Sequence, residues 1–89
     1  MVAMDLQHRL DLLITIAQEL GWTIRREPLG GEGGGLCVIK GQQVLFIDTM
    51  ADLETRYDRT LGALAARTEL EQRYLPPELR EDLEKARLA

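Results

Sequence analysis

The sequence predicts an α+β fold with the element order α-β-β-β-α-α, in which helices pack on a small three-stranded antiparallel sheet. Near the amino terminus, and again after residue 50, apolar residues recur at spacings of three and four, as they do in amphipathic helices. Between these stretches, two apolar runs rich in β-branched residues flank a short polar turn, which is typical of a β-hairpin. A length of 89 residues indicates one domain, residues 1–89.

The first helix is expected over residues 4–20. Asp5 is a suitable N-cap residue, and Gly21 follows at a position that favours glycine after a helix. The apolar stripe of this helix is formed by Leu6, Leu10, Leu13, Ala17 and Leu20.

The first strand is expected over residues 22–27, where Trp22 and Ile24 alternate with polar neighbours before Pro28 ends the run. Of the six residues 30–35, five are glycine. We expect this glycine-rich segment to connect the first strand to the hairpin.

The hairpin is expected to pair strands 36–40 and 43–48 around a turn in which Gly41 can adopt a positive φ. Successive residues of a strand point to opposite faces, yet both runs are apolar without alternation. Strands of this kind need cover on both faces.

A second long helix is expected over residues 50–67, where Thr49 and Asp52 have the spacing of a capping box. A short single turn follows. A Pro-Pro pair then predicts an extended chain reversal, with Pro77 in the first turn of a last helix over residues 77–88.

Composition limits the classes of function. The net charge of −4 makes nucleic-acid binding a poor interpretation, because such binding depends on neutralising phosphates with basic residues. The chain contains no run of about 18 apolar residues, so no transmembrane helix is expected. The amino terminus lacks the pattern of a signal peptide, and the lone Cys37 fits a reducing compartment. We therefore expect a cytoplasmic protein.

The glycine-rich segment has three interpretations. Glycines allow backbone N–H groups to converge on an anion such as phosphate, but no Lys-Ser/Thr pair and no helix follow the segment. The favoured interpretation is therefore a flexible connection between two strands. The third interpretation, intermediate between these, is a mobile flap that closes over a partner. If the segment binds a small molecule or a divalent metal together with the nearby acids, the candidate binding residues are Gly31, Gly33, Gly34, Asp48, Asp52 and Arg26.

No catalytic residue and no cofactor is predicted. His8 and Cys37 are the only residues of their types, and each is expected to be an ordinary helix or strand residue. The second helix has Tyr57 to Leu61 where a zinc peptidase would carry His-Glu-x-x-His, so a metal centre of that kind is not expected.

Three segments, Gly34–Gly41, Val44–Asp48 and Tyr74–Arg80, resemble a group of short bacterial proteins of unknown function. The resemblance covers roughly residues 30–83. It implies no activity and carries over no catalytic residues.

The predicted function follows from the amount of apolar surface. Three short helices in 89 residues can cover one face of a small sheet well and the other only partly. Exposed apolar residues would each cost roughly 1.5–3 kcal/mol of burial free energy. We therefore expect a non-enzymatic interaction or structural module that forms a homodimer or binds another protein. The alternative is a small-molecule or metal-binding protein that uses the glycine-rich segment and the acids near Asp48.

Overall fold

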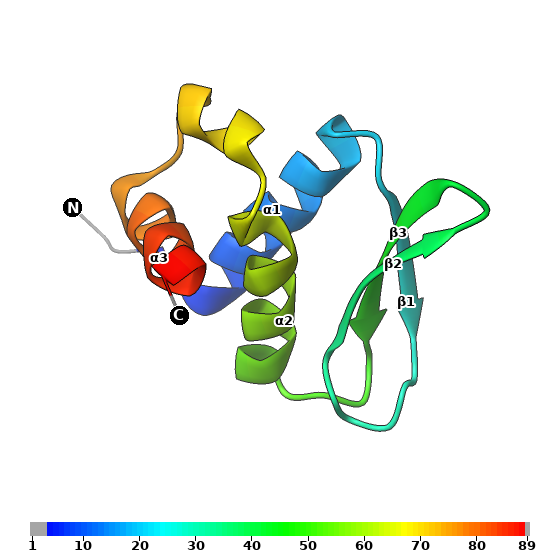
Figure 1. Ribbon diagram of the computed structural model, residues 1–89. Coiled ribbons are helices and arrows are strands. Elements are labelled where there is room, and N and C mark those ends of the chain that lie inside the picture. The colour runs from blue at the N-terminus through cyan, green and yellow to red at the C-terminus, as the bar shows by residue number, and fades with distance from the viewer. Residues whose placement is uncertain (1–3, 89) are drawn as a thin grey trace.

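Helices lie on one side of a three-stranded sheet in the computed structural model, which describes residues 4–88 (Figure 1). The elements are α1 (Leu6–Glu19), β1 (Thr23–Glu27), β2 (Gly34–Ile39), β3 (Gln42–Asp48), α2 (Leu53–Ala65), the 3-10 helix η1 (Thr68–Gln72) and α3 (Pro77–Leu88). The α+β class and the order α-β-β-β-α-α are confirmed. Helices α1 and α2 pack against the sheet, and α3 packs on α2 (Figure 1).

The prediction of an all-antiparallel sheet is wrong for one of its two strand pairs. The strand order is β1-β3-β2, and β1 pairs with β3 in parallel, with Ile24 opposite Leu45. Only β2 pairs antiparallel with β3, with Leu36 opposite Leu45. Strand β3 occupies the central position, which suits its apolar run, whereas β1 with Arg25 and Arg26 occupies an edge.

Local capping fixes both ends of α1 where they were expected. The Asp5 side chain accepts a hydrogen bond from the His8 N–H at 2.8 Å. At the other end Gly21 has φ +88°, and the Trp22 N–H donates to the Ala17 carbonyl at 3.0 Å, as in a Schellman motif.

The second helix begins later than expected. Asp52, and not Thr49, is its N-cap residue, and the Asp52 carboxylate accepts from the Thr55 N–H at 2.8 Å. Helix α2 therefore begins at Leu53, and a turn at residues 49–51 separates it from β3. The last helix begins at Pro77, as predicted.

The hairpin turn consists of Lys40 and Gly41, both with positive φ, at +52° and +77°. Positive φ at both central residues defines a type I′ turn, whose twist matches that of the paired strands. In such a two-residue turn the flanking residues Ile39 and Gln42 form a hydrogen-bonded pair. This geometry fixes which backbone groups of β2 face β3 and which face the open edge.

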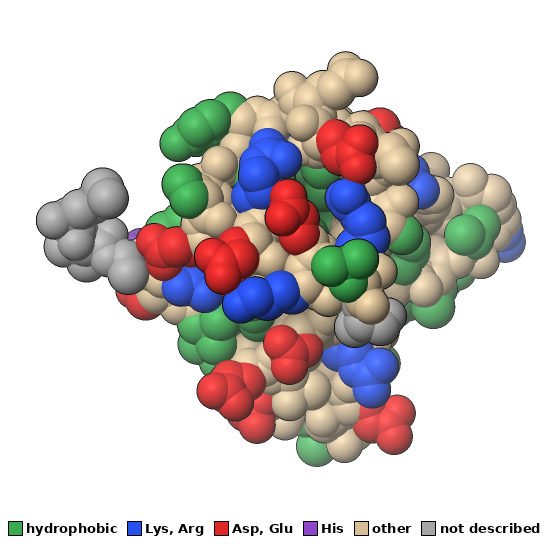
Figure 2. Space-filling model, turned by 60° about the vertical axis from the view of Figure 1, so that its left-hand side comes forward, with side chains coloured by type: hydrophobic (Ala, Val, Ile, Leu, Met, Phe, Trp, Pro, Cys, Tyr) green, Lys and Arg blue, Asp and Glu red, His purple; other side chains and the backbone are tan. Residues whose placement is uncertain are grey.

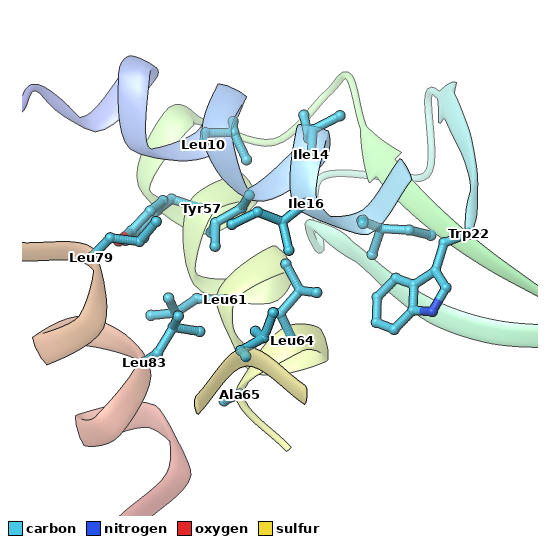
Figure 3. Packing of buried hydrophobic residues seen from close by; sticks show 14 of the residues in the cluster. Leu10, Ile14, Ile16, Trp22, Tyr57, Leu61, Leu64, Ala65, Leu79 and Leu83 are labelled. Atoms are coloured by element: carbon cyan, nitrogen blue, oxygen red, sulfur yellow. The ribbon is translucent and has the colours of Figure 1, made fainter. Parts of the chain in front are cut away.

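One hydrophobic core joins the helices to the inner face of the sheet. It includes Leu13 of α1, Leu45 of β3, Leu64 of α2 and Leu79 of α3, all with no measurable exposure. The labelled side chains of this core, among them Ile16, Leu61 and Leu64, lie together between the helices (Figure 3). Each of these residues contributes roughly 1.5–3 kcal/mol through burial.

Across residues 4–88, no helix has the length and apolar character that a membrane span requires.

Candidate functional site

The carboxylate of Asp48 lies at the centre of the glycine-rich segment, at the end of β3. Its Oδ1 accepts hydrogen bonds from the N–H groups of Leu29 and Met50, both at 2.9 Å. Its Oδ2 accepts from Gly31 at 2.6 Å and from Gly33 at 3.1 Å. Asp48 is fully buried, so the loop surrounds this side chain with four converging backbone donors.

Two glycines of this loop occupy places where a side chain would not fit. A Cβ at Gly33, which has φ +100°, would overlap the side chains of Thr55 and Arg59 on α2. A Cβ at Gly34, which has φ +90°, would overlap the backbone of Phe46. The Arg59 Nε also donates to the Glu32 carbonyl at 2.9 Å. The glycines therefore let the loop approach both Asp48 and α2 closely.

The environment of Asp48 favours its ionised form. Burial by itself would raise the pKa of the carboxyl, but the hydrogen bonds from Leu29, Met50, Gly33 and Gly31 to the carboxylate outweigh burial and lower the pKa to about 2. At neutral pH the site is thus a buried carboxylate whose charge is satisfied by backbone dipoles.

This geometry resembles an anion-binding loop whose anion is part of the same chain. Gly31, Gly33 and Asp48, three of the predicted binding residues, are indeed brought together, but they bind one another. Gly34 begins β2, opposite Ile47 of β3. Because each carboxylate oxygen of Asp48 already accepts two N–H groups, the loop and its carboxylate complete each other's hydrogen bonding.

The remaining predicted binding residues lie elsewhere. Asp52 caps α2, and its hydrogen bond from the Thr55 N–H lowers its pKa. Arg26 is an exposed residue of the edge strand β1, opposite Ile47. Among the described residues, no group of three or more His, Cys, Asp or Glu side chains is arranged to hold a metal ion.

A second polar cluster, which the sequence analysis missed, links the three helices. Arg9 of α1 donates to Asp82 of α3 at 3.1 Å and to Glu78 at 2.8 Å. The hydroxyl of Tyr57 on α2 donates to the same oxygen of Asp82 at 2.6 Å. Burial and the hydrogen bond to Asp82 raise the pKa of Tyr57, so the phenol stays protonated as a donor. No sequence signal links residues that lie 25 and 73 positions apart.

A groove of about 580 Å³ lies beside this cluster, between α1, α2 and α3. Its lining includes the apolar residues Leu6, Leu61 and Ala86 and the charged residues Glu54, Asp58, Asp82 and Lys85. The view in which the α3 side comes forward shows acidic and basic side chains interspersed over that face of the molecule (Figure 2). Two of these charged groups have partners outside the groove lining: Asp82 pairs with Arg9, and Lys85 pairs with Glu81 at 3.1 Å.

The sheet presents its apolar residues differently on its two sides. Leu45 and Ile47 face the helices, so the alternate residues Val44 and Phe46 lie on the outer face, beside Cys37 of β2. A hollow of about 400 Å³ on this side lies between the glycine-rich loop and Phe46. No helix within residues 4–88 lies over the outer face (Figure 1).

The far half of β2 is the most exposed apolar segment of the sheet. Val38 is 65% exposed and Ile39 42% exposed, and Cys37 is exposed as well. On β3, by contrast, Val44, Leu45 and Ile47 are buried. The exposed apolar residues of the hairpin are therefore concentrated on β2, whereas Val44, Leu45 and Ile47 of β3 are buried.

Comparison with models of protein families, with curated proteins and with solved structures finds no match for this chain. The fold and the two polar clusters define a small α+β protein whose buried polar groups stabilise its own loops and helices. The resemblance to short bacterial proteins of unknown function stays a prediction.

Proposed function

We propose that the protein is a small, non-enzymatic, cytoplasmic interaction module that forms a homodimer. The observation that carries this proposal is the exposure of Val38 and Ile39 on the edge strand β2. These two neighbours point to opposite faces of the sheet, so what they expose together is the apolar edge of β2, and an uncharged apolar edge is a place where another strand can add. A second copy is the simplest source of such a strand, because most soluble oligomers are symmetric homo-oligomers.

The internal polar clusters support an interaction role over a catalytic one. Asp48 holds the glycine-rich loop, and Tyr57, Arg9 and Asp82 hold the helices together. Each cluster uses its charged groups for hydrogen bonds within the chain. The cytoplasm is the proposed compartment because its reducing conditions keep an exposed thiol such as Cys37 reduced.

Sedimentation equilibrium tests the proposal. At micromolar concentration we expect twice the chain mass of 10.1 kDa. The substitution Val38→Lys should shift the protein to a monomer, because burying an unpaired ammonium in an interface is costly. Tyr74→Lys is the matched control: Tyr74 is 84% exposed but lies outside the sheet, so this variant should remain dimeric. A monomeric wild-type protein at micromolar concentration would contradict the proposal.

A small-molecule-binding protein is the second candidate, favoured by the 400 Å³ hollow between the glycine-rich loop and the sheet. Its volume falls within the range of ligand pockets, roughly 300–1,000 Å³. A thermal-shift screen with nucleotides and divalent cations tests this candidate. A ligand seated in the hollow should raise the melting temperature of the wild-type protein but not of Cys37→Trp, whose larger side chain would occupy the space.

A further inference from the structure

We infer that two copies pair through β2, edge to edge and antiparallel, so that their two sheets join into one continuous sheet. This inference rests on the proposed homodimer and specifies its geometry. It is carried by the backbone groups of β2, by the distribution of charge on the two sheet edges and by the charges at the ends of the strand.

The hairpin turn determines which backbone groups of β2 lie on the open edge. Ile39 and Gln42 form the hydrogen-bonded pair next to the turn, so Cys37 and Gly35 also direct their N–H and C=O groups toward β3. The Asp48 N–H donates to the Gly33 carbonyl at 3.4 Å, which extends the same alternation. The N–H and C=O groups of the intervening residues, Leu36 and Val38, therefore point away from β3, toward the open edge.

The two edges of the sheet differ in how they are protected against pairing. The edge strand β1 carries Arg25, Arg26 and Glu27, and charged side chains on an edge discourage the addition of another strand. The edge strand β2 has the sequence Gly-Gly-Leu-Cys-Val-Ile, without a charge or a proline. An apolar, uncharged edge of this length is an open template for another strand.

The structure favours one register of the pairing. Centring the two-fold axis on Cys37 places Leu36 of each copy opposite Val38 of the other, so their outward backbone groups can exchange hydrogen bonds. A shift toward the turn would require Lys40, which has a turn conformation, to pair as a strand residue. A shift the other way would place Ile39 opposite Gly33, which is buried against α2.

Charge complementarity supports this antiparallel arrangement. Glu32 precedes β2 and Lys40 follows it, and both residues are exposed. Antiparallel pairing brings the Lys40 end of each strand toward the Glu32 end of the other copy. The arrangement is self-complementary and closes after two copies, as an isologous contact requires.

Disulfide trapping with diamide tests the register. In a non-hydrogen-bonded antiparallel pair the two Cα atoms lie about 4.5 Å apart, within the range of a disulfide. The two Cys37 thiols of a dimer would form a disulfide bond, and diamide would take up their two protons and two electrons and become the hydrazine. The control is Cys37→Ser/Ile39→Cys, whose thiols lie on the same face but roughly 13 Å apart in this register.

We expect the wild-type protein to form the cross-linked dimer at least tenfold faster than the control, at a rate per dimer that does not depend on dilution. Equal rates in a protein that sedimentation shows to be a dimer would overturn this pairing and leave the proposed homodimer standing. A monomer by sedimentation would overturn both.

A second measurement needs no substitution. In a mixture of ¹³C-labelled and unlabelled protein, this register predicts a nuclear Overhauser effect between the Hα atoms of Cys37 in the two copies. Its absence from a confirmed dimer would also overturn the pairing.

Discussion

At the scale of single residues, Asp48 connects the chemistry of an anion-binding loop to the stability of the fold. Four backbone N–H groups converge on its carboxylate, as they would on a bound phosphate. Because the anion is a side chain of the same protein, its hydrogen bonds hold the glycine-rich loop in one conformation. The loop amides of Gly31 and Gly33 are therefore engaged, although the composition of the segment favoured a flexible connection.

The pKa of Asp48 predicts how stability depends on pH. The folded-state pKa of about 2 is below the ordinary value of 3.8, so the unfolded chain takes up a proton more readily. The stabilisation is complete above about pH 5 and is lost as the pH falls toward 2. In Asp48→Asn this contribution is absent, and an amide NH₂ also faces backbone donors. Urea unfolding at pH 7, 5 and 3 should show lower stability and a weaker pH dependence for this variant.

The control for this experiment is Asp58→Asn, because Asp58 is an exposed acid of α2. Its urea midpoint should follow the wild-type pH dependence. A wild-type pH dependence that persists in Asp48→Asn would show that other carboxyl groups, such as the N-cap Asp52, account for the acid sensitivity.

At the scale of secondary-structure elements, the β2–β3 hairpin combines a well-formed turn with one strained residue. Lys40 has a φ of +52°, in a region that costs most non-glycine residues about 1 kcal/mol. Asparagine accepts this conformation more readily, and Asn-Gly is the favoured pair for a type I′ turn.

The substitution Lys40→Asn should therefore stabilise the protein by about 0.5–1 kcal/mol. Thermal or urea unfolding at low protein concentration measures the change. Gln42→Asn, which alters an extended residue directly after the turn, should give no such gain. A decrease in stability for Lys40→Asn would mean that the turn is not of type I′.

At the scale of the whole molecule, polar contacts connect the helices of one layer, and the described helices cover one face of the sheet. Arg9, Tyr57 and Asp82 bring together α1, α2 and α3. Two arginines add further contacts between elements. Arg87 of α3 donates to the carbonyl of Ala65, the last residue of α2, at 3.0 Å, and Arg73, which follows η1, pairs with Glu19 of α1. Hydrogen bonds and ion pairs therefore connect the helices to each other, while β2 pairs with a strand on one side only within the described residues.

The substitution Tyr57→Phe tests the helical cluster. It removes the hydrogen bond to Asp82 but leaves the ring in the core and the ion pair with Arg9 in place. We expect a loss of about 1–2 kcal/mol in the free energy of unfolding. Tyr74→Phe should have no measurable effect, because Tyr74 is 84% exposed. Equal stability of Tyr57→Phe and the wild-type protein would show that the hydroxyl contributes nothing to the cluster.

The sequence by itself determined the features that depend on neighbouring residues. Asp5 and Gly21 mark the two ends of α1, Pro77 begins α3, and Gly41 lies in the hairpin turn. These features could be predicted because caps and turns arise from contacts within a few positions of the chain. The apolar run of residues 44–47 also predicted a strand, whereas the expected cover on both faces is not matched by a helix on the outer face among the described residues (Figure 1).

Only the tertiary structure decided which distant segments meet. The insertion of β3 beside β1, the closure of the loop amides over Asp48, and the contact of Tyr57 with Asp82 join residues 15 or more positions apart. Such contacts leave no periodic pattern in the chain. They form because the fold must bury the apolar faces of α1, α2 and β3 together, and the polar groups enclosed in that process then need partners from wherever the chain passes.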